Sequence, residues 1–159
     1  MKYFSIAELT RSSEAKKQNI SNLPSDKEIE NLKSLVENLL DPIRAEWGHA
    51  IYVSSGFRCA KLNAIVHGSS TSHHLRGMAA DISAGAQEQN KKLFDLICVM
   101  RQNGLISFTQ LIDETKVKGS PYQWIHISYD PDNLKNQVMH GGYKDPKTGK
   151  TVYTYEDIE

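Results

Sequence analysis

The sequence has few of the features that mark membrane, nucleic-acid-binding or disulfide-rich proteins. No apolar run approaches the roughly 18 residues of a membrane span, and residues 1–19 lack the apolar core of a signal peptide. The 19 basic and 19 acidic residues balance, and no basic block favours nucleic acid. Cys59 and Cys98 fit neither a CxxC pattern nor a disulfide framework, so we expect two free thiols.

At 159 residues the chain has the length of one domain, which we expect to span 1–159. Apolar periodicity and capping signals predict a short helix after Ser5 and further helices over about 26–47 (with a kink near Pro42), Cys59–Val66 and Glu88–Gln102. Alternating patterns predict strands over Ile51–Ser55, Met78–Ser83, Phe108–Asp113 and Gln123–Tyr129, with a late strand over Thr151–Tyr155. From Pro131 onward the polar sequence and its Gly141-Gly142 pair suggest loops. The fold class we expect is α+β, with helices packed on a small, mostly antiparallel sheet.

Two segments carry candidate chemistry: Ser72–Asp81, with the sequence SHHLRGMAAD, and Trp124–His126. Together they offer the imidazoles of His74 and His126 and the carboxylate of Asp81, a ligand set that suits zinc. Three protein ligands leave a fourth position open, as in catalytic zinc sites. Gly77 argues against one helix joining His74 to Asp81, since glycine costs about 1 kcal/mol relative to alanine there. A loop carrying His74 that leads into a strand carrying Asp81 is the alternative.

Each of these side chains also has an ordinary interpretation when taken singly. His74 could be a loop histidine, Asp81 a turn or capping residue, and His126 a half-buried strand histidine. Apart from His73, which is adjacent to His74, the remaining histidines have the sequence context of solvated or loop residues, and they are His49, His67 and His140. The metal hypothesis therefore depends on the whole pattern.

The pattern SxHxxGxAxD at Ser72–Asp81, followed by Trp124–His126, resembles the zinc peptidases of family M15. Val53–Arg58 is similar to the family's SSGYR element, and Leu62–His74 to its LN…VGGS…SQH segment. The opening Phe4–Ser13 resembles the start of the short, phage-associated M15A branch. This resemblance covers about residues 4–129 and leaves 131–159 as a polar tail without a functional account. The family includes D-alanyl-D-alanine carboxypeptidases and phage L-alanyl-D-glutamate endolysins, and it implies the fold of the hedgehog and DD-peptidase domains.

The resemblance implies one zinc ion per chain, held by His74, Asp81 and His126. It also implies that Arg58 contacts the substrate and stabilises charge on the attacked carbonyl, as a permanently charged guanidinium can. Ser72 either caps its loop or makes a hydrogen bond that orients His74 toward the metal. His73 is expected to point elsewhere, and Gly77 to supply a conformation that other residues resist.

The general base departs from the best-known family pattern. Many members place an acid three residues before the last histidine ligand, where this chain has Gln123. Gln123 stays a candidate for binding the substrate or for orienting a metal ligand. The segment Gln110–Glu114 resembles a Gln-Leu-Ile-x-Glu segment of the short branch, which indicates Glu114 as the base and Asp113 as the less favoured candidate. Strand alternation places these two carboxylates on opposite faces, so at most one faces the metal.

The function implied is a zinc metallopeptidase that hydrolyses peptidoglycan stem peptides or cross-links containing D-amino acids, as a phage or prophage endolysin would. The alternative is a non-catalytic zinc-binding module of the same fold, which the missing acid at Gln123 keeps open. We expect a peptidoglycan peptide as the partner, no nucleic acid and no membrane insertion. With no signal peptide, we expect synthesis in the cytoplasm and release to the wall through lysis or a holin. The bond cleaved and the oligomeric state stay open.

Overall fold

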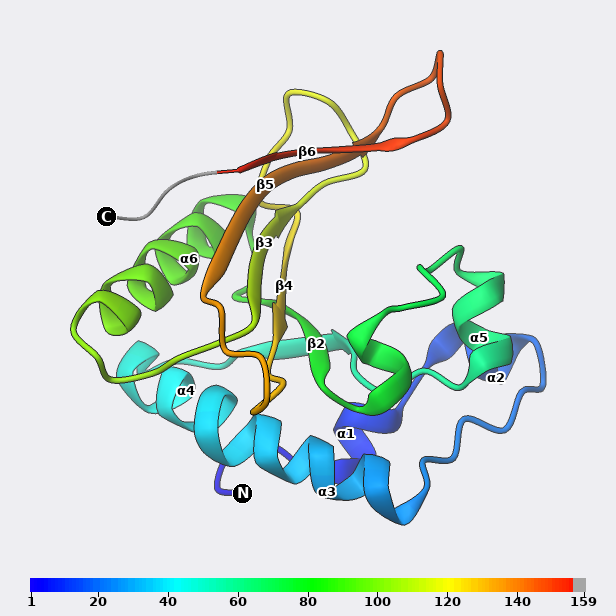
Figure 1. The fold of residues 1–159 in the computed structure, drawn as a ribbon, viewed down its shortest axis with the longest axis horizontal. Coiled ribbons are helices and arrows are strands. Elements are labelled where there is room, and N and C mark those ends of the chain that lie inside the picture. Colours follow the sequence, from blue (N-terminus) through cyan, green and yellow to red (C-terminus); the bar gives the residue numbers. More distant parts are fainter. Residues whose placement is uncertain (156–159) are drawn as a thin grey trace.

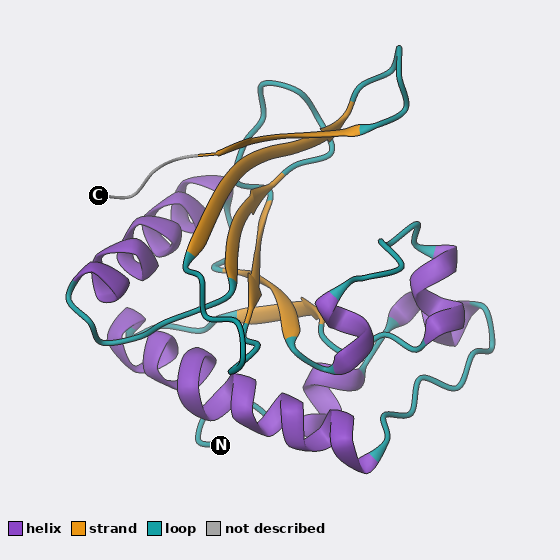
Figure 2. Cartoon of the chain, in the orientation of Figure 1, coloured by secondary structure: helices purple, strands orange, loops and turns teal. Residues whose placement is uncertain are grey.

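The computed structural model describes residues 1–155, which build helices around one six-stranded sheet (Figures 1 and 2). The helices are α1 (Ile6–Thr10), α2 (Ser13–Lys17), α3 (Asp26–Leu35), η1 (Val36–Leu40), α4 (Asp41–Trp47), α5 (Ala60–Ile65), η2 (His73–Arg76) and α6 (Gln87–Gln102). The strands are β1 (Tyr52–Ser55), β2 (Ala79–Ser83), β3 (Gln110–Glu114), β4 (Trp124–Ser128), β5 (Gln137–Lys144) and β6 (Thr151–Tyr155). The predicted α+β class is confirmed.

The strands lie in the order β1-β2-β4-β3-β5-β6. Every neighbouring pair is antiparallel except β3 and β5, which run parallel. Figure 1 shows α6 and the α3–α4 line along one side of the sheet, with η2 and α5 on the other. The core lies under the first group, where Ile125 and Ile127 of β4 are fully buried. Side chains on the opposite face of β4 are therefore left for a site.

The helix predicted over residues 26–47 is interrupted by the π-helical segment η1. It begins as predicted, with the Ser25–Glu28 capping box. Pro42 lies in the first turn of α4, and it has no N–H to donate to the preceding turn and crowds that turn with its ring. A π turn widens the backbone at this place, so the Asp41 N–H bonds to the carbonyl of Val36. The proline thus changes the helix type instead of only kinking it.

The segment after Pro131 is more ordered than predicted. The loops expected there were wrong for β5, which pairs with β3 on one side and β6 on the other. Gly141 and Gly142, interpreted as a turn, form an irregularity within β5. The late strand over Thr151–Tyr155 is confirmed as β6, whereas α2 had not been predicted.

None of the helices within residues 1–155 combines the length and the apolar character that a membrane span requires.

Candidate metal centre

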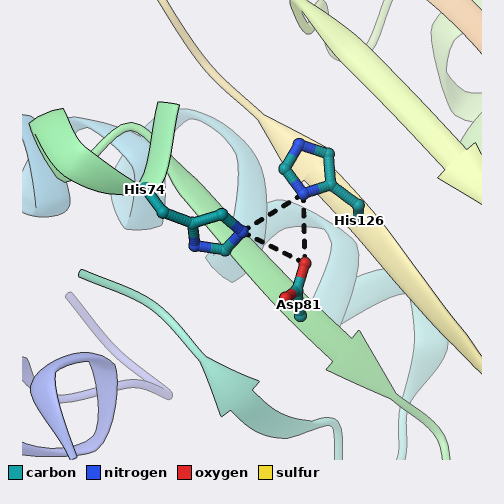
Figure 3. A group of neighbouring side chains, drawn as sticks. All are labelled: His74, Asp81 and His126. Atoms are coloured by element: carbon teal, nitrogen blue, oxygen red, sulfur yellow. Dashed lines mark hydrogen bonds and ion pairs between the residues drawn. The ribbon is translucent and has the colours of Figure 1, made fainter. Parts of the chain in front are cut away.

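Three buried side chains from three elements point toward one another (Figure 3). His74 belongs to η2, Asp81 to β2 and His126 to β4. His74 Nε2 lies 3.2 Å from Asp81 Oδ1 and 3.3 Å from His126 Nδ1. His126 Nδ1 in turn lies 3.0 Å from Asp81 Oδ1. The structure therefore brings together the three residues that the sequence proposes as ligands.

The triangle of these three atoms has the size that a tetrahedral zinc ion requires. Bonds of about 2.0–2.1 Å at tetrahedral angles separate ligand atoms by about 3.3–3.4 Å. The observed sides of 3.0, 3.2 and 3.3 Å approach that value. Two nitrogens and one oxygen also match the donors found in three-ligand zinc sites. The group can thus hold a metal ion without rearrangement of the chain.

The sheet register explains why Asp81 and His126 share a face. The antiparallel β2–β4 ladder places Asp81 directly opposite His126, and directly opposed residues project their side chains to the same side. The residues on either side of His126 are fully buried in the core on the other face. Two residues of the site are therefore fixed by strand pairing alone.

His74 is fixed by the short η2 segment. Its Nδ1 lies 2.6 Å from the carbonyl oxygen of Gly56, which can only accept, so the proton is on Nδ1 and Nε2 keeps its lone pair for a metal. Ser72 Oγ accepts from the backbone N–H of His74 at 3.3 Å. Of the two interpretations of Ser72, capping fits the structure, and the hydrogen bond that orients the imidazole comes from Gly56 instead. Sequence reasoning had given Gly56 no role.

Asp81 is held by a second partner, Arg58. The Arg58 Nη2 donates to Asp81 Oδ2 at 2.8 Å, and its Nε donates to Ser55 Oγ at 2.8 Å. The carboxylate thus presents Oδ1 to the two imidazoles while Oδ2 faces the guanidinium. Arg58 also lines the cavity. Its contacts fit an orienting role toward Asp81 beside the predicted substrate role.

The two candidate bases separate as strand alternation predicts. Glu114 lines the same cavity as the three candidate ligands. Asp113 faces away, where its Oδ1 accepts from the Tyr122 backbone N–H at 2.7 Å and its Oδ2 pairs with His140 Nδ1 at 3.1 Å. Of the two carboxylates, only Glu114 is therefore placed to exchange protons with a group bound near the three candidate ligands. The interpretation of His140 as a solvated or loop histidine was wrong, since it lies on β5 and packs against Phe94.

Gln123 is a predicted site residue that the structure does not bring to the cavity. The side-chain oxygen of Gln123 accepts from the backbone N–H of Lys116 at 3.1 Å. The backbone N–H of Gln123 donates to the backbone carbonyl of Glu114. These contacts fasten the loop between β3 and β4. His73 does line the cavity, although it lies outside the group of three candidate ligands. Burial, with Arg76 and His126 nearby, lowers the pKa of His73 to about 4.

The local electrostatics favour the protonation states that a metal site needs. Burial alone would raise the pKa of the Asp81 carboxyl, but the His74 and His126 imidazoles hold it well below its usual range. Burial lowers the pKa of His126, against the effect of its hydrogen bond to Asp81. An ionised carboxylate and a neutral imidazole are the forms that ligate metals.

The pKa of the Glu114 carboxyl is shifted upward, in the direction opposite to that of Asp81. Burial raises its pKa to about 8, the Asp81 and Asp113 carboxylates add to the rise, and Arg58 acts against it. A carboxyl that titrates near neutral pH can both take and give a proton.

These groups open into one cavity of about 680 Å³. Its walls come from segments far apart in the sequence: the 66–74 segment before and within η2 on one side, and β3, β4, β5 and β6 on the other. Met139, Thr151 and Tyr153 bring the supposed polar tail into the site. No sequence signal marks these three as site residues, because their position depends on the parallel pairing of β5 with β3.

Three side chains that could hold a metal ion at a cavity, with a titratable carboxyl lining the same cavity, match the arrangement of a metal-dependent hydrolase. The sequence model of the Peptidase M15 family matches residues 2–113, which include His74 and Asp81. The chain therefore belongs to the M15 peptidase family. No curated protein matches the chain significantly.

Proposed function

We propose that the protein is a zinc-dependent peptidase that cleaves peptide bonds in peptidoglycan stems or cross-links. The observation that carries the proposal is the buried triangle of His74, Asp81 and His126, with Glu114 facing the same cavity, in a member of a peptidase family. His74, Asp81 and His126 would hold one ion per chain. When bound, zinc acts as a Lewis acid that polarises the scissile carbonyl and makes water a nucleophile at neutral pH.

Glu114 is the proton carrier in this proposal. Its carboxylate takes a proton from the attacking water and then gives it to the amine that leaves when the peptide bond breaks. The raised pKa of about 8 suits the second of these steps, because the carboxyl then holds its proton until the amine accepts it.

Arg58 has a positioning task in the same scheme. Its ion pair with Asp81 Oδ2 at 2.8 Å fixes the direction of Oδ1 toward the imidazoles. The guanidinium also places a permanent positive charge at the cavity wall, near the carbonyl oxygen on which negative charge develops.

The substrate proposal rests on the motifs that resemble D-alanyl-D-alanine carboxypeptidases and L-alanyl-D-glutamate endolysins. A volume of about 680 Å³ falls within the range of small-ligand sites, and it accommodates a short peptide and not a folded protein. The role we assign is lysis or remodelling of the cell wall, of the kind that phage endolysins perform.

The test is digestion of purified peptidoglycan by zinc-loaded protein, with fragments identified by mass spectrometry. We expect one new amine and one new carboxyl at a single stem or cross-link position. His126→Ala removes a ligand, so this variant should lose cleavage, stoichiometric zinc and the rise in melting temperature that zinc gives the wild type.

A wild type that binds one zinc ion and releases no fragment would contradict the peptidase proposal and favour the non-catalytic zinc-binding module. Cleavage that survives in zinc-free His126→Ala would contradict the assignment of the site.

A further inference from the structure

The hairpin of β5 and β6 brings a tyrosine to the cavity, on the side of Glu114. Tyr153 lines the cavity together with Glu114 and the three candidate ligands. It belongs to β6, at the edge of the sheet farthest from β1. In Figure 1 this hairpin rises beyond β3 and β4. Neither the family match to residues 2–113 nor the motif pattern includes it.

A bulge in β5 aims this side chain. His140 pairs with Thr154 and Tyr143 with Val152, so Gly141 and Gly142 together oppose Tyr153 alone. Gly141 has a φ of +91°, a conformation that favours glycine. Such bulges bend a strand and redirect the side chains opposite them.

Gly142 lets the tyrosine ring and the Glu114 carboxyl approach the same point of the backbone. A Cβ added at Gly142 would lie 2.5 Å from Glu114 Oε2 and 2.7 Å from Tyr153 Cε1. Both side chains therefore pack directly on the glycine, and the two groups are neighbours across it. A larger residue at this position would have to displace one of them.

The hydroxyl of Tyr153 is available to a ligand. Within residues 1–155 it makes no hydrogen bond, and the residue is 37% exposed. Burial raises the pKa of Tyr153 to about 12, with Glu114 and Asp81 adding to the rise. The phenol thus keeps its proton at neutral pH and acts as a donor.

A second hydrogen-bond donor would supplement Arg58 at the oxygen on which negative charge develops. Two N–H groups of Arg58 are already bound, one to Asp81 and one to Ser55. Oxyanion sites in acyl transfer use fixed donors aimed at the oxygen on which charge develops. A neutral phenol that lines the same cavity supplies one without adding charge beside Glu114.

We propose that Tyr153 is a catalytic residue that donates a hydrogen bond from its phenolic O–H to the carbonyl oxygen of the scissile peptide bond as that oxygen becomes negative. This inference rests on the proposed peptidase function. The tyrosine keeps its proton throughout, and the proton that moves passes from water to Glu114 and then to the leaving amine. Gly142 is the positioning residue, because the Tyr153 ring and the Glu114 carboxyl both pack against it.

The test compares Tyr153→Phe with the wild type, both zinc-loaded, on peptidoglycan fragments. Tyr153→Phe keeps the ring and removes the donor, so we expect kcat to fall about 10- to 100-fold. We expect KM to change less than about threefold and zinc stoichiometry and melting temperature to stay unchanged. Gly142→Ala should also lower kcat. Gly149→Ala is its control in the same hairpin, since a Cβ there meets no atom within 4 Å, and the backbone strain at its φ of +66° should lower stability without lowering kcat.

A second measurement does not require turnover. A phosphinate dipeptide carries a tetrahedral oxyanion, and its Kd for zinc-loaded protein is measured by calorimetry. We expect Tyr153→Phe to weaken this Kd about 10-fold or more. A wild type that cleaves while Tyr153→Phe matches it in both kcat and phosphinate Kd would overturn the role of Tyr153 alone. A wild type that neither cleaves nor binds the phosphinate would overturn the peptidase proposal and this inference with it.

Discussion

Arg58 shows how one side chain can join two parts of a site. Its Nη2 holds Asp81 Oδ2 and its Nε holds Ser55 Oγ, each at 2.8 Å, and its side chain is largely buried. A guanidinium makes these two bonds with a fixed angle between them, which an ammonium cannot do. The orientation of Asp81 therefore depends on an arginine and not on positive charge alone.

Arg58→Lys should weaken zinc binding about 10- to 100-fold, because groups that orient ligands typically contribute that much to metal affinity. The measurement is competition for zinc with a chelator of known affinity. Arg76→Lys is the control, since Arg76 pairs with Asp130 at 3.4 Å and is half exposed. Equal zinc affinity in Arg58→Lys and wild type would refute the orienting role.

Glu114 should make the stability of the metal-free protein depend on pH. Its pKa is raised to about 8 in the folded chain, so between its ordinary value of about 4.3 and pH 8 the folded state binds more protons than the unfolded state. The free energy of unfolding therefore decreases as pH rises through this range. Glu114→Gln has no proton to lose, so the difference in unfolding free energy between variant and wild type should grow in the variant's favour from pH 5 to pH 8.

Urea unfolding of both chelator-treated proteins at several pH values measures this difference. A constant difference across the range would show that the pKa of Glu114 is not raised in the folded chain.

At the scale of elements, η2 depends on its contact with α3. Gly77 ends η2 with a φ of +69°, and a Cβ there would lie 2.6 Å from the carbonyl oxygen of Glu28. The predicted special conformation at Gly77 is thus confirmed, and the close approach to α3 is an additional reason for glycine. The turn that carries His74 is pressed against the helix layer at this point.

Gly77→Ala should therefore cost more stability than Gly48→Ala. Both glycines end a helical segment at positive φ, but a Cβ at Gly48 meets nothing within 4 Å. We expect about 1 kcal/mol for Gly48→Ala from backbone strain alone, and at least about 1 kcal/mol more for Gly77→Ala from the steric conflict with α3. Denaturant unfolding of the two variants measures this, and equal losses would rule out the close approach.

The elements that could be predicted from the sequence are those with strong local patterns. The capping box at Ser25 and the alternation around His126 depend on neighbouring residues only, and both were found. Alternation also separated Asp113 from Glu114 correctly. β5 was missed because the Gly141-Gly142 pair resembles a turn, while in the structure it is a bulge held by strands on both sides.

At the scale of the whole molecule, the site joins residues that no local pattern connects. His74, Asp81 and His126 could be proposed because a motif and a resemblance tied them together. Tyr153 could not be, because its approach to Glu114 requires β5 to lie parallel to β3 and β6 to return beside it. Gly56 was missed for a similar reason: what matters there is its carbonyl, which every residue type possesses.

In the proposed mechanism, Glu114 is the proton carrier beside a metal held by His74, Asp81 and His126. The most direct test is the rate of peptidoglycan hydrolysis by zinc-loaded Glu114→Gln, with zinc content measured in the same sample and Asp113→Asn as the control on the opposite face of β3. We expect Glu114→Gln to keep one zinc ion per chain and lose at least about 100-fold in kcat, while folded Asp113→Asn keeps its activity. Hydrolysis at the wild-type rate by Glu114→Gln, or its loss in folded Asp113→Asn alone, would contradict the account.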